Sequence, residues 1–492
     1  MNSISKKFNL IVAELGIKND VICKRFVIGT NKISAMLVYI NGLSDKTIID
    51  RDVLTPLMTG TKEEIPISPD MLKYITENFI PMSNTEVTKD INKVIESLKL
   101  GKSIIFVDYY DDYIILDTIG GVHRSITDPP NESSIRGSRE GFIENLEVNL
   151  SILKRLLKDK NLKAETLKIG KRSQTEIYIV YVDDIVDKNV LSRLKSRLEK
   201  IDVDFISDTG MIEQYIEDSP FSPFPQFYST ERPDVIQSNL LQGRIAVLMN
   251  GTPSVLTAPA LFFEFFQGIE DYNERITISN LPRVLRLLAV FIVITLSPLY
   301  LTLISYNVEL IPIKFIIPIV QSRTGIALSP FLEILLMELI VEFLREGGLR
   351  LPTKIAQTLS IVGGIIIGNT AVESKVVSPT TLLVIGTSVV ATFLIPNYQM
   401  SLSIRFLRFP MLVLANAMGF LGVSTGWFII VVHLCSLKSL GIPYFSIRKN
   451  DLKDIFIRAP LWQMNKRPEA IPINDTARQN NFRKYFRRNK NE

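Results

Sequence analysis

The sequence predicts an α/β soluble N-terminal region, an α-helical polytopic membrane domain of about four to six spans, and a short cytoplasmic C-terminal tail. Three observations lead to this prediction: residues before about 240 have the mixed composition of a soluble protein, long charge-free runs follow, and the end of the chain is basic. About twenty apolar residues of helix cross a bilayer, and the runs reach that length. They cover residues 287–308, 355–372, 376–404 and 409–437.

The soluble half is expected to contain two cytosolic α/β subdomains, at residues 1–130 and 131–240. In the first, residues 103–118 have two β-rich runs around a polar turn, as in a hairpin. In the second, a helical segment at 142–159 leads into the strand-like TEIYIVYVDD and the helical KNVLSRLKSRLEK. The Pro-, Ser- and Gly-rich stretch ITDPPNESSIRGSREG separates the two.

Neither subdomain carries the signature of an enzyme. No phosphate-binding loop, dinucleotide fingerprint, zinc-protease motif or nucleophile elbow occurs, and the two histidines, His123 and His433, leave few candidates for a catalytic triad. Cys23 and Cys435 lie in settings too different for a disulfide framework or a zinc site. We therefore expect no enzymatic activity, no cofactor and no metal site. The basic end of the chain has no fold around it that would indicate nucleic-acid binding.

Residues 241–283 are expected to form a hairpin and an interfacial helix before the membrane. Asn250-Gly251 separates two apolar runs, which is a strong hairpin signal, although Pro253 makes the second strand doubtful. The segment 260–267, ALFFEFFQ, carries four phenylalanines. Aromatic side chains favour the boundary of a bilayer, and Glu264 among them is expected to face water.

The topology of the transmembrane domain, residues 284–440, is set by its basic residues. Arg283 and Arg286 before the first run keep the N-terminal half inside. If each apolar run, and also the glutamate-rich segment before residue 350, is counted as one span, the number of spans is odd. The basic tail, residues 441–492, would then lie outside. Either that segment lies at the interface, or the glycine-rich run 409–437 turns back. We expect both termini to be cytoplasmic, with the tail solvated or on anionic lipid.

One charge-free run has small and polar side chains on a single helical face. At 100° per residue, residues 355–372 place five of them on one narrow stripe. One interpretation is close packing of two membrane helices through a GxxxG pair, and the other is a helix that lines a polar path for ions. The stripe consists of Gln357, Ser360, Gly364, Gly368 and Ala371.

Three glutamates recur at intervals of four in the apolar segment 331–346. Glu338, Glu342 and Glu346 share one helical face, where carboxylates are costly in a membrane unless they pair, face water or lie at its boundary. Pairing with Arg345 or Arg350 is one interpretation. A vestibule that attracts cations is the other.

Several strings, in their order and spacing, resemble the spore germination receptor A-subunit family of the GerA type. The resemblance covers most of the chain and includes ERPD at 231–234, LLQGRIAVLMNGTPSVL, EDYNER, PRVLR, SPLYLTLISYNVELIP, REGGLRLP at 345–352, SIVGGIIIGNTAV and LGIPYFS. Positions within these strings that carry the resemblance are Glu231, Arg232, Pro233, Asp234, Gly251, Pro253, Asp271, Tyr272, Arg345, Glu346 and Pro352.

The resemblance implies a multi-pass protein of the inner spore membrane that passes nutrient sensing by a partner on to germination. It implies a permease-like B subunit and a lipoprotein C subunit as partners, membrane lipid around the helices, and oligomers of this subunit that form an ion path. The family also contains a sporulation paralogue of similar architecture, so an auxiliary sporulation channel is an alternative. A secondary transporter is another, although the sequence shows no repeat of interrupted helices.

Overall fold

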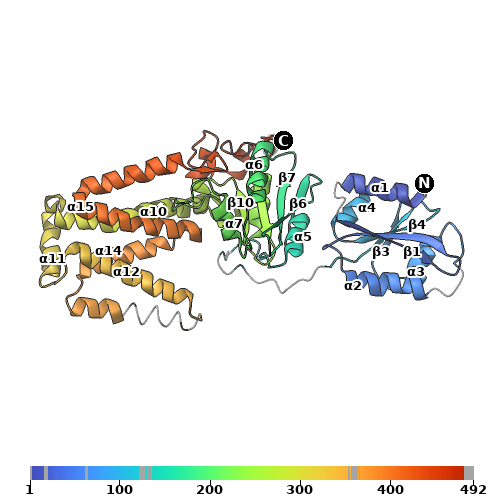
Figure 1. Ribbon diagram of the computed structural model, residues 1–492, viewed down its shortest axis with the longest axis horizontal. Coiled ribbons are helices and arrows are strands. Elements are labelled where there is room, and N and C mark those ends of the chain that lie inside the picture. Colours follow the sequence, from blue (N-terminus) through green and yellow to red (C-terminus); the bar gives the residue numbers. More distant parts are fainter. Residues whose placement is uncertain are drawn as a thin grey trace, which may run out of the picture.

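The structure consists of three parts that follow one another along the chain. Figure 1 shows an α/β subdomain at the N-terminus, a second α/β subdomain beside it, and a bundle of long helices at the opposite end. This computed structural model describes residues 3–15, 20–60, 65–120, 129, 132, 136–352, 355, 364 and 366–480.

The first subdomain is built on an antiparallel sheet with the strand order β1-β2-β4-β5-β3. The predicted hairpin at 103–118 is confirmed, because β4 and β5 pair directly. The segment TEVT forms the edge strand β3. The strands are β1 (Val21–Ile28), β2 (Ile33–Ile40), β3 (Thr85–Thr88), β4 (Ser103–Val107) and β5 (Tyr113–Leu116).

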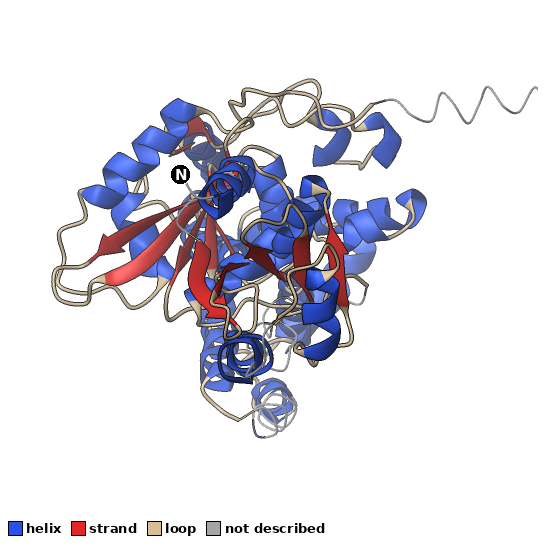
Figure 2. Ribbon diagram, turned by 90° about the vertical axis from the view of Figure 1, so that its right-hand side faces the viewer, coloured by secondary structure: helices blue, strands red, loops and turns tan. Residues whose placement is uncertain are grey.

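Helices cover both faces of this first sheet (Figure 2). Alternate residues of a strand point to opposite faces, so Met36 and Val38 join one core while Ala35 and Leu37 join the other. Burial on both faces explains why these strands are apolar throughout. The covering elements are α1 (Ser3–Leu15) and α4 (Ile91–Lys99) on one face, and α2 (Lys46–Ile48), the π-helical turns Ile49–Leu54 and Pro56–Gly60, and α3 (Met71–Asn78) on the other.

The second subdomain repeats the topology of the first. Its sheet has the order β6-β7-β9-β10-β8, so in each sheet the first, second, fourth, fifth and third strands follow one another. Asn250 and Gly251 form the predicted turn between β9 and β10, with Gly251 at φ +93°. The strands are β6 (Leu162–Ile169), β7 (Thr175–Val182), β8 (Tyr228–Thr230), β9 (Ile245–Met249) and β10 (Val255–Ala258).

This second sheet is also covered on both faces. Residues of β7 and β9 alternate between a core shared with α6 and α7 and a core shared with α5 and α8. The helices predicted around 142–159 and in KNVLSRLKSRLEK correspond to α5 and α6. The four helices are α5 (Leu146–Leu156), α6 (Lys188–Glu199), α7 (Thr209–Ile216) and α8 (Pro233–Leu241).

Two features of residues 241–283 differ from the expectation. The hairpin completes the second sheet, with β9 pairing to β7 in its middle, so it does not stand apart from that subdomain. The segment Phe262–Phe266 is a 3₁₀ turn, η3, whose four phenylalanines are at most 9 % exposed. They pack on Tyr444 and Phe445 of the tail, which local sequence could not indicate. Glu264 pairs with Arg244 instead of facing water.

The helical part is organised around α10, which packs on α12, α14 and α15. Its core is apolar and continues into the phenylalanines of η3. In the part of the chain that the structure describes, α10 and α15 are long and apolar enough to cross a membrane. The elements are α9 (Glu270–Asn273), α10 (Ile276–Ser305), η4 (Val308–Leu310), α11 (Ile313–Arg323), α12 (Pro330–Leu349), α14 (Pro379–Thr392) and α15 (Tyr398–Ser436).

Within α15 the chain reverses direction at Gly419, whose φ of +58° and ψ of −137° are not helical. Residues 398–418 and 420–436 form two antiparallel arms: Gly422 lies against the Leu414 carbonyl and Gly426 against the Met411 side chain. The glycine-rich run therefore turns back, as one of the two sequence alternatives required. Tyr306, just beyond α10, packs on Gly419 and donates a hydrogen bond to the carbonyl of Asn416.

Both arms of α15 end at the second subdomain. Gln399 at the start of the first arm donates to Glu213 of α7 at 3.2 Å, and Ser403 donates to the carbonyl of Pro223. At the end of the second arm, His433 Nε2 lies 2.9 Å from Ser222 Oγ. The chain therefore enters and leaves the helical part on the same side (Figure 1).

The tail folds back onto the second subdomain. Ile473 bridges to Val186 and packs on Gly243, while Ser439 donates to the carbonyl of Gln226. The described part of the tail is thus packed on protein, and the basic string at residues 483–490 lies outside the described residues. Its elements are β11 (Lys438–Ser439), β12 (Ile442–Pro443), α16 (Leu452–Ile455) and the 3₁₀ turn η5 (Leu461–Gln463).

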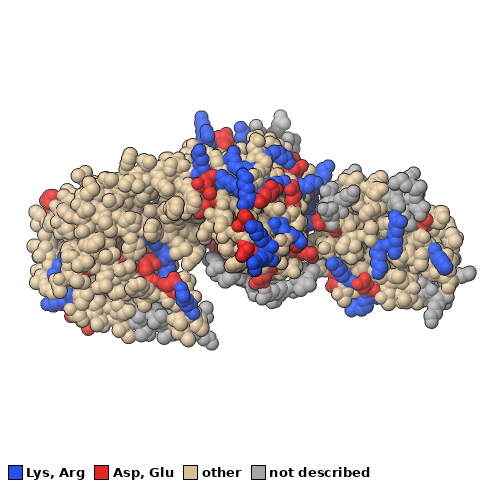
Figure 3. Space-filling view, viewed as in Figure 1, with Lys and Arg blue, Asp and Glu red and all other residues tan. Residues whose placement is uncertain are grey.

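The surfaces of the three parts differ in charge. Figure 3 shows Lys, Arg, Asp and Glu crowded over the second subdomain and sparse over the visible face of the helical part. Large apolar side chains of α10, including Leu281, Leu288 and Phe291, are exposed there, at 48–63 %. Such a surface suits lipid contact and does not suit water.

Candidate functional site

A buried charged cluster joins the start of α10 to α9 and to the tail. Asp271 on α9 is 2 % exposed and accepts hydrogen bonds from Arg283 Nε at 2.9 Å and from Arg286 Nη1 at 2.7 Å. The two arginines lie three positions apart, on one face of α10, so both reach the same carboxylate. We call these three residues, together with Tyr272, Asp454 and Arg458, the junction cluster.

The tail contributes the other half of the junction cluster. Asp454 on α16 accepts from Arg283 Nη1 at 2.7 Å and from the hydroxyl of Tyr272 at 2.7 Å. Burial raises the pKa of Asp454, and the neighbouring Arg283 opposes that shift. Burial likewise raises the pKa of Tyr272, so it remains a neutral donor. The carboxylate thus ties the tail to α10.

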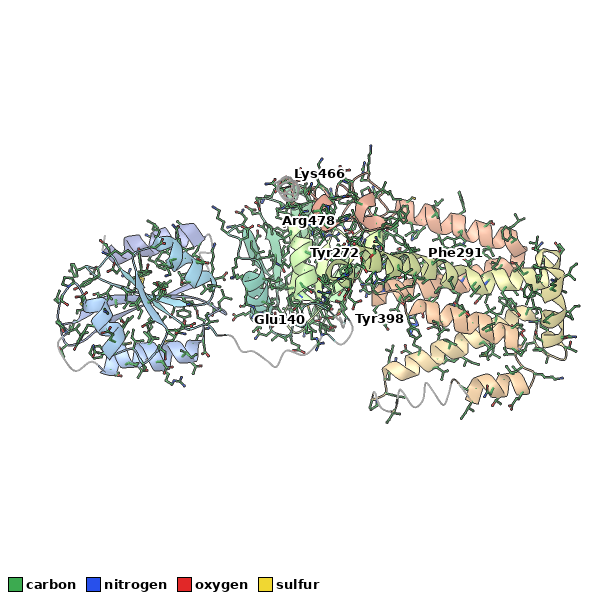
Figure 4. All side chains as sticks on the ribbon, turned by 180° about the vertical axis from the view of Figure 1, so that it is seen from behind. Glu140, Tyr272, Phe291, Tyr398, Lys466 and Arg478 are labelled. Carbon is green, nitrogen blue, oxygen red and sulfur yellow. The ribbon has the colours of Figure 1, made fainter. Side chains whose placement is uncertain are left out.

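Arg458 closes the junction cluster from the tail side. Its guanidinium is 5.9 Å from the centroid of the Tyr272 ring and donates to the carbonyls of Tyr272 and Glu274 at 3.4 and 3.2 Å. Arg458 itself is only 2 % exposed. Figure 4 shows Tyr272 between the second subdomain and the first turns of α10. The hydrogen-bonded network makes a stiff joint between α10, α9 and the tail.

Inside the helical part, α12 and α15 share a second set of buried charges. Arg408 Nη1 lies 2.6 Å from Glu338 Oε2, and both side chains are 1 % exposed. Ser297 of α10 donates to the other oxygen of Glu338 at 2.9 Å. Glu342 pairs with Arg405 at 3.1 Å and with Arg408 at 3.2 Å. Charges at membrane depth are tolerated when paired in this way.

The three predicted glutamates therefore have cationic partners. Glu346 pairs with Arg350 at 2.7 Å near the exposed end of α12, and Arg345 lies 3.9 Å from Glu342, as the pairing interpretation expects. The partner of Glu338 comes from a helix about seventy residues away, so no local pattern could identify it. The vestibule stays a prediction.

A further buried acidic residue on α12 was not predicted from the sequence. Glu333 is fully buried; it pairs with Arg323 at 2.5 Å and accepts from the backbone N–H of Ser378 at 2.7 Å. Its position, five residues before Glu338, falls outside the interval of four that drew attention to the others. The signal in the sequence was Arg323, an isolated arginine between two apolar segments that requires an acidic partner if it is buried.

The predicted stripe is only partly within the described residues, because Gln357 and Ser360 lie outside them. Gly364 is exposed, and a Cβ placed there would meet no atom of the described residues within 4 Å. Gly368 is buried, with the Leu382 side chain 3.7 Å from such a Cβ, and Ala371 packs on the apolar core. Gly368 thus faces α14, while Gly364 has no described neighbour.

The motif positions around α8 are structural. Arg232 donates to both oxygens of Asp234, at 3.1 and 2.7 Å, and to the carbonyls of Glu132 and Ser138, both at 3.0 Å. Pro233 begins α8, and the carbonyl of Glu231 accepts from Phe142 N–H at 2.8 Å. Pro253 lies in the turn before β10, and Pro352 follows α12. No group of three or more His, Cys, Asp or Glu suited to a metal occurs among the described residues.

The comparisons with known proteins agree with this arrangement. The family model described as Bacillus/Clostridium GerA spore germination protein matches residues 9–470. The chain belongs to the GerA spore germination family. Its motif strings, which begin at residue 231 in the second subdomain and continue through the helical part to the start of the tail, lie within the matched range. The resemblance noted from those strings is confirmed.

Relatives of similar length support the family assignment. Spore germination protein KA of Bacillus subtilis is 38 % identical over 482 residues, covering 97 % of this chain and 88 % of the relative. Spore germination protein GerLA of Bacillus cereus is 34 % identical, covering 94 % of each chain. Uncharacterized membrane protein YfkQ of B. subtilis is 38 % identical, covering 92 % and 88 %.

One solved structure is also similar to this GerA-family chain. The N-terminal domain of the A subunit of the Bacillus megaterium spore germinant receptor GerK3 is 33 % identical, with a TM-score of 0.41. The match covers 53 % of this chain and 96 % of that domain.

Proposed function

We propose that this protein is the A subunit of a nutrient germinant receptor in the inner spore membrane. In this role it transduces nutrient sensing by a permease-like B subunit, with a lipoprotein C subunit as further partner, into germination. The observation that carries the proposal is the GerA family match across residues 9–470. Germination-protein relatives that align over nearly their whole lengths support it.

The proposed membrane topology has both termini in the cytoplasm. The single crossing of α10 ends beside Gly419, and the two arms of α15 contribute one crossing out and one back. The chain between Ser305 and Tyr398 must therefore cross the membrane an odd number of times. One crossing there gives four spans and three give six; with three, α12 and α14 would supply the two that run back to the cytoplasm.

The proposed mechanism is a shift between closed and open arrangements of the helices, without bond chemistry. Nutrient binding by the B subunit would reach α10 through the second subdomain and the junction cluster. Copies of the A subunit would assemble so that the stripe of Gly364 lines a shared ion path. Support comes from the absence of any described atom within 4 Å of the Gly364 Cβ position, which leaves room for a neighbouring copy.

Replacement of Gly364 by leucine tests the proposed ion path in spores that carry the variant as their sole copy. A bulky side chain on that face is expected to block ion release in response to nutrient, or to cause release without nutrient. Gly386→Leu is the matched control, because Gly386 is an exposed glycine of α14 with no atom within 4 Å of its Cβ position. Normal ion release from Gly364→Leu spores at normal protein levels would contradict the path.

An auxiliary sporulation channel remains the alternative function. The similarity to YfkQ, an uncharacterized membrane protein, equals in percentage identity that to spore germination protein KA. Deletion of the gene separates the two functions. Loss of the response to nutrient with normal germination by non-nutrient triggers supports a receptor subunit, and loss of both supports a general channel.

A further inference from the structure

A cavity of about 270 Å³ lies where the second subdomain, the η3 segment and the tail meet. This volume approaches the lower end of small-molecule sites, roughly 300–1,000 Å³. The cavity is separate from the junction cluster except at Asp454, which lines it. Figure 4 shows that two other lining residues, Lys466 and Arg478, project from the tail close to the second subdomain.

A buried guanidinium forms part of the cavity wall. Arg244, at the start of β9, is 3 % exposed and pairs with Glu264 of η3. Its Nε, unlike the Nη1 that meets Glu264, donates to no acceptor among the described residues. Buried donors without acceptors are rare in folded proteins and call for an explanation. A bound anion would supply one.

The rim of the cavity has an excess of uncommitted positive charge. Lys453, Lys466 and Arg478 line it and are exposed, and none has a carboxylate within 4.0 Å in the described part of the chain. The acids at the rim are already engaged. Asp451 accepts the backbone N–H groups of Glu469 and Ala470 at 2.8 and 3.0 Å, and Asp454 is held by Arg283. The field inside the cavity therefore favours an anion.

The remaining wall is apolar, with Leu261, Phe263, Ile455 and Met464 among the lining side chains. We propose that this cavity binds a small organic anion, whose phosphate or carboxylate group meets Arg244 and the basic rim while its apolar part rests on these side chains. This proposal is independent of the ion path. Because the ligand would touch the second subdomain, η3 and α16 together, its binding would brace the tail segment that holds Arg283 of α10.

Calorimetry on the purified full-length chain in lipid nanodiscs tests the proposal. The probes are phenyl phosphate and benzoate at constant ionic strength, with benzyl alcohol as the neutral control. At least one anion is expected to bind saturably, at one per chain, and benzyl alcohol is not. Saturable binding of phenyl phosphate alone assigns a phosphate ligand, and binding of benzoate alone assigns a carboxylate.

Two rim variants decide whether binding occurs in this cavity. The double variant Lys466→Gln with Arg478→Gln should weaken anion binding about tenfold or more, because two charge-assisted contacts are lost. Lys449→Gln removes an exposed charge of the same tail outside the cavity and should change affinity less than about twofold. Arg244→Lys keeps the charge but removes Nε, and should also weaken binding if it folds. Absence of saturable anion binding, or equal affinity in the double variant, would overturn the proposal.

Discussion

Arg408 illustrates how a single side chain connects two helices of the helical part. It lies on the first arm of α15, and its guanidinium reaches Glu338 and Glu342 of α12 at 2.6 and 3.2 Å. The spacing of the glutamates left two interpretations open, pairing with Arg345 or Arg350 and a vestibule that attracts cations, and local sequence could not choose between them. Residues three or four positions apart on a helix are neighbours, so local sequence identifies Arg345 and Arg350 as possible partners of the glutamates. Arg408 can be identified as a partner only after the packing of α15 on α12 is known.

Arg408→Met is expected to destabilise the protein by about 3–5 kcal/mol, because it leaves the carboxylate of Glu338 buried without a cation. The apparent melting temperature of the detergent-solubilised chain should fall. The exposed pair of Arg350 and Glu346 gives a matched control: Arg350→Gln should cost less than about 1 kcal/mol. Adding Glu338→Gln to Arg408→Met should recover part of the loss, and no recovery would show that packing, not charge, was lost.

Glu213 provides a prediction about pH at the contact between α7 and α15. Burial raises its pKa to about 7, so the folded protein keeps this proton longer than the unfolded chain, whose glutamate titrates near 4.5. The folded state then binds more protons, and stability falls as pH rises from about 4.5 to 7. Glu213→Gln should remove this fall, raising stability above pH 7 by up to roughly 3 kcal/mol and changing little below pH 5. Thermal unfolding of both proteins between pH 5 and 8 measures this difference in stability. Parallel profiles of stability against pH for the two proteins would contradict the prediction.

At the scale of elements, the reversal in α15 depends on glycine at the places where its arms touch. The sequence identified the glycine-rich run as one that turns back or spans, and the count of basic residues favoured keeping the tail inside. The position of the turn was not predictable, since Gly419, Gly422 and Gly426 are equally permissive in isolation. Packing distinguishes them: Gly419 has positive φ, and the other two let the arms approach.

Gly422→Ala is expected to force the arms of α15 apart, because its Cβ would overlap the Leu414 carbonyl. We expect a loss of about 2 kcal/mol or more, seen as a lower apparent melting temperature and lower protein level in membranes. The control is Gly386→Ala in α14, where a Cβ meets no atom within 4 Å. That change should be neutral or slightly stabilising, as alanine favours helix. Equal effects of the two substitutions would argue against close contact of the arms.

The aromatic segment η3 shows where reasoning from composition fails. ALFFEFFQ has the residue types of a membrane-interface helix, and such segments are recognised by composition alone. In the structure its phenylalanines are covered by the tail, which lies about 180 residues further along the chain. A contact of that sequence separation leaves no trace in a local window. For the same reason, the repetition of strand order between the two sheets was invisible before the fold was known.

At the scale of the whole molecule, the division into soluble and helical parts followed from charge and length alone, because a bilayer imposes both. The finding that the chain enters and leaves the helical part on the same side depends on the reversal at Gly419, which the sequence did not locate. Gly364 of the stripe has no described atom within 4 Å of its Cβ position, so the proposed ion path requires a second copy of the chain to complete its wall.

Labelling with a membrane-impermeant maleimide tests the topology. With Cys435→Ser as background, the exposed Cys23 and an added Lys466→Cys should both react in inside-out vesicles and not in right-side-out vesicles. Lys314→Cys on α11 should give the opposite pattern, since α11 follows the outward crossing of α10. Reaction of Cys23 and residue 466 in vesicles of opposite orientation would exclude an even number of spans.

Because the tail returns to the second subdomain, the helical part is attached to that subdomain at both of its ends. The polypeptide leaves the second sheet through the junction cluster into α10 and comes back from α15 through Ser439 and Tyr444 onto the same body. A tilt of the second subdomain would therefore act on α10 and on the second arm of α15 at the same time, because the tail fixes both to it.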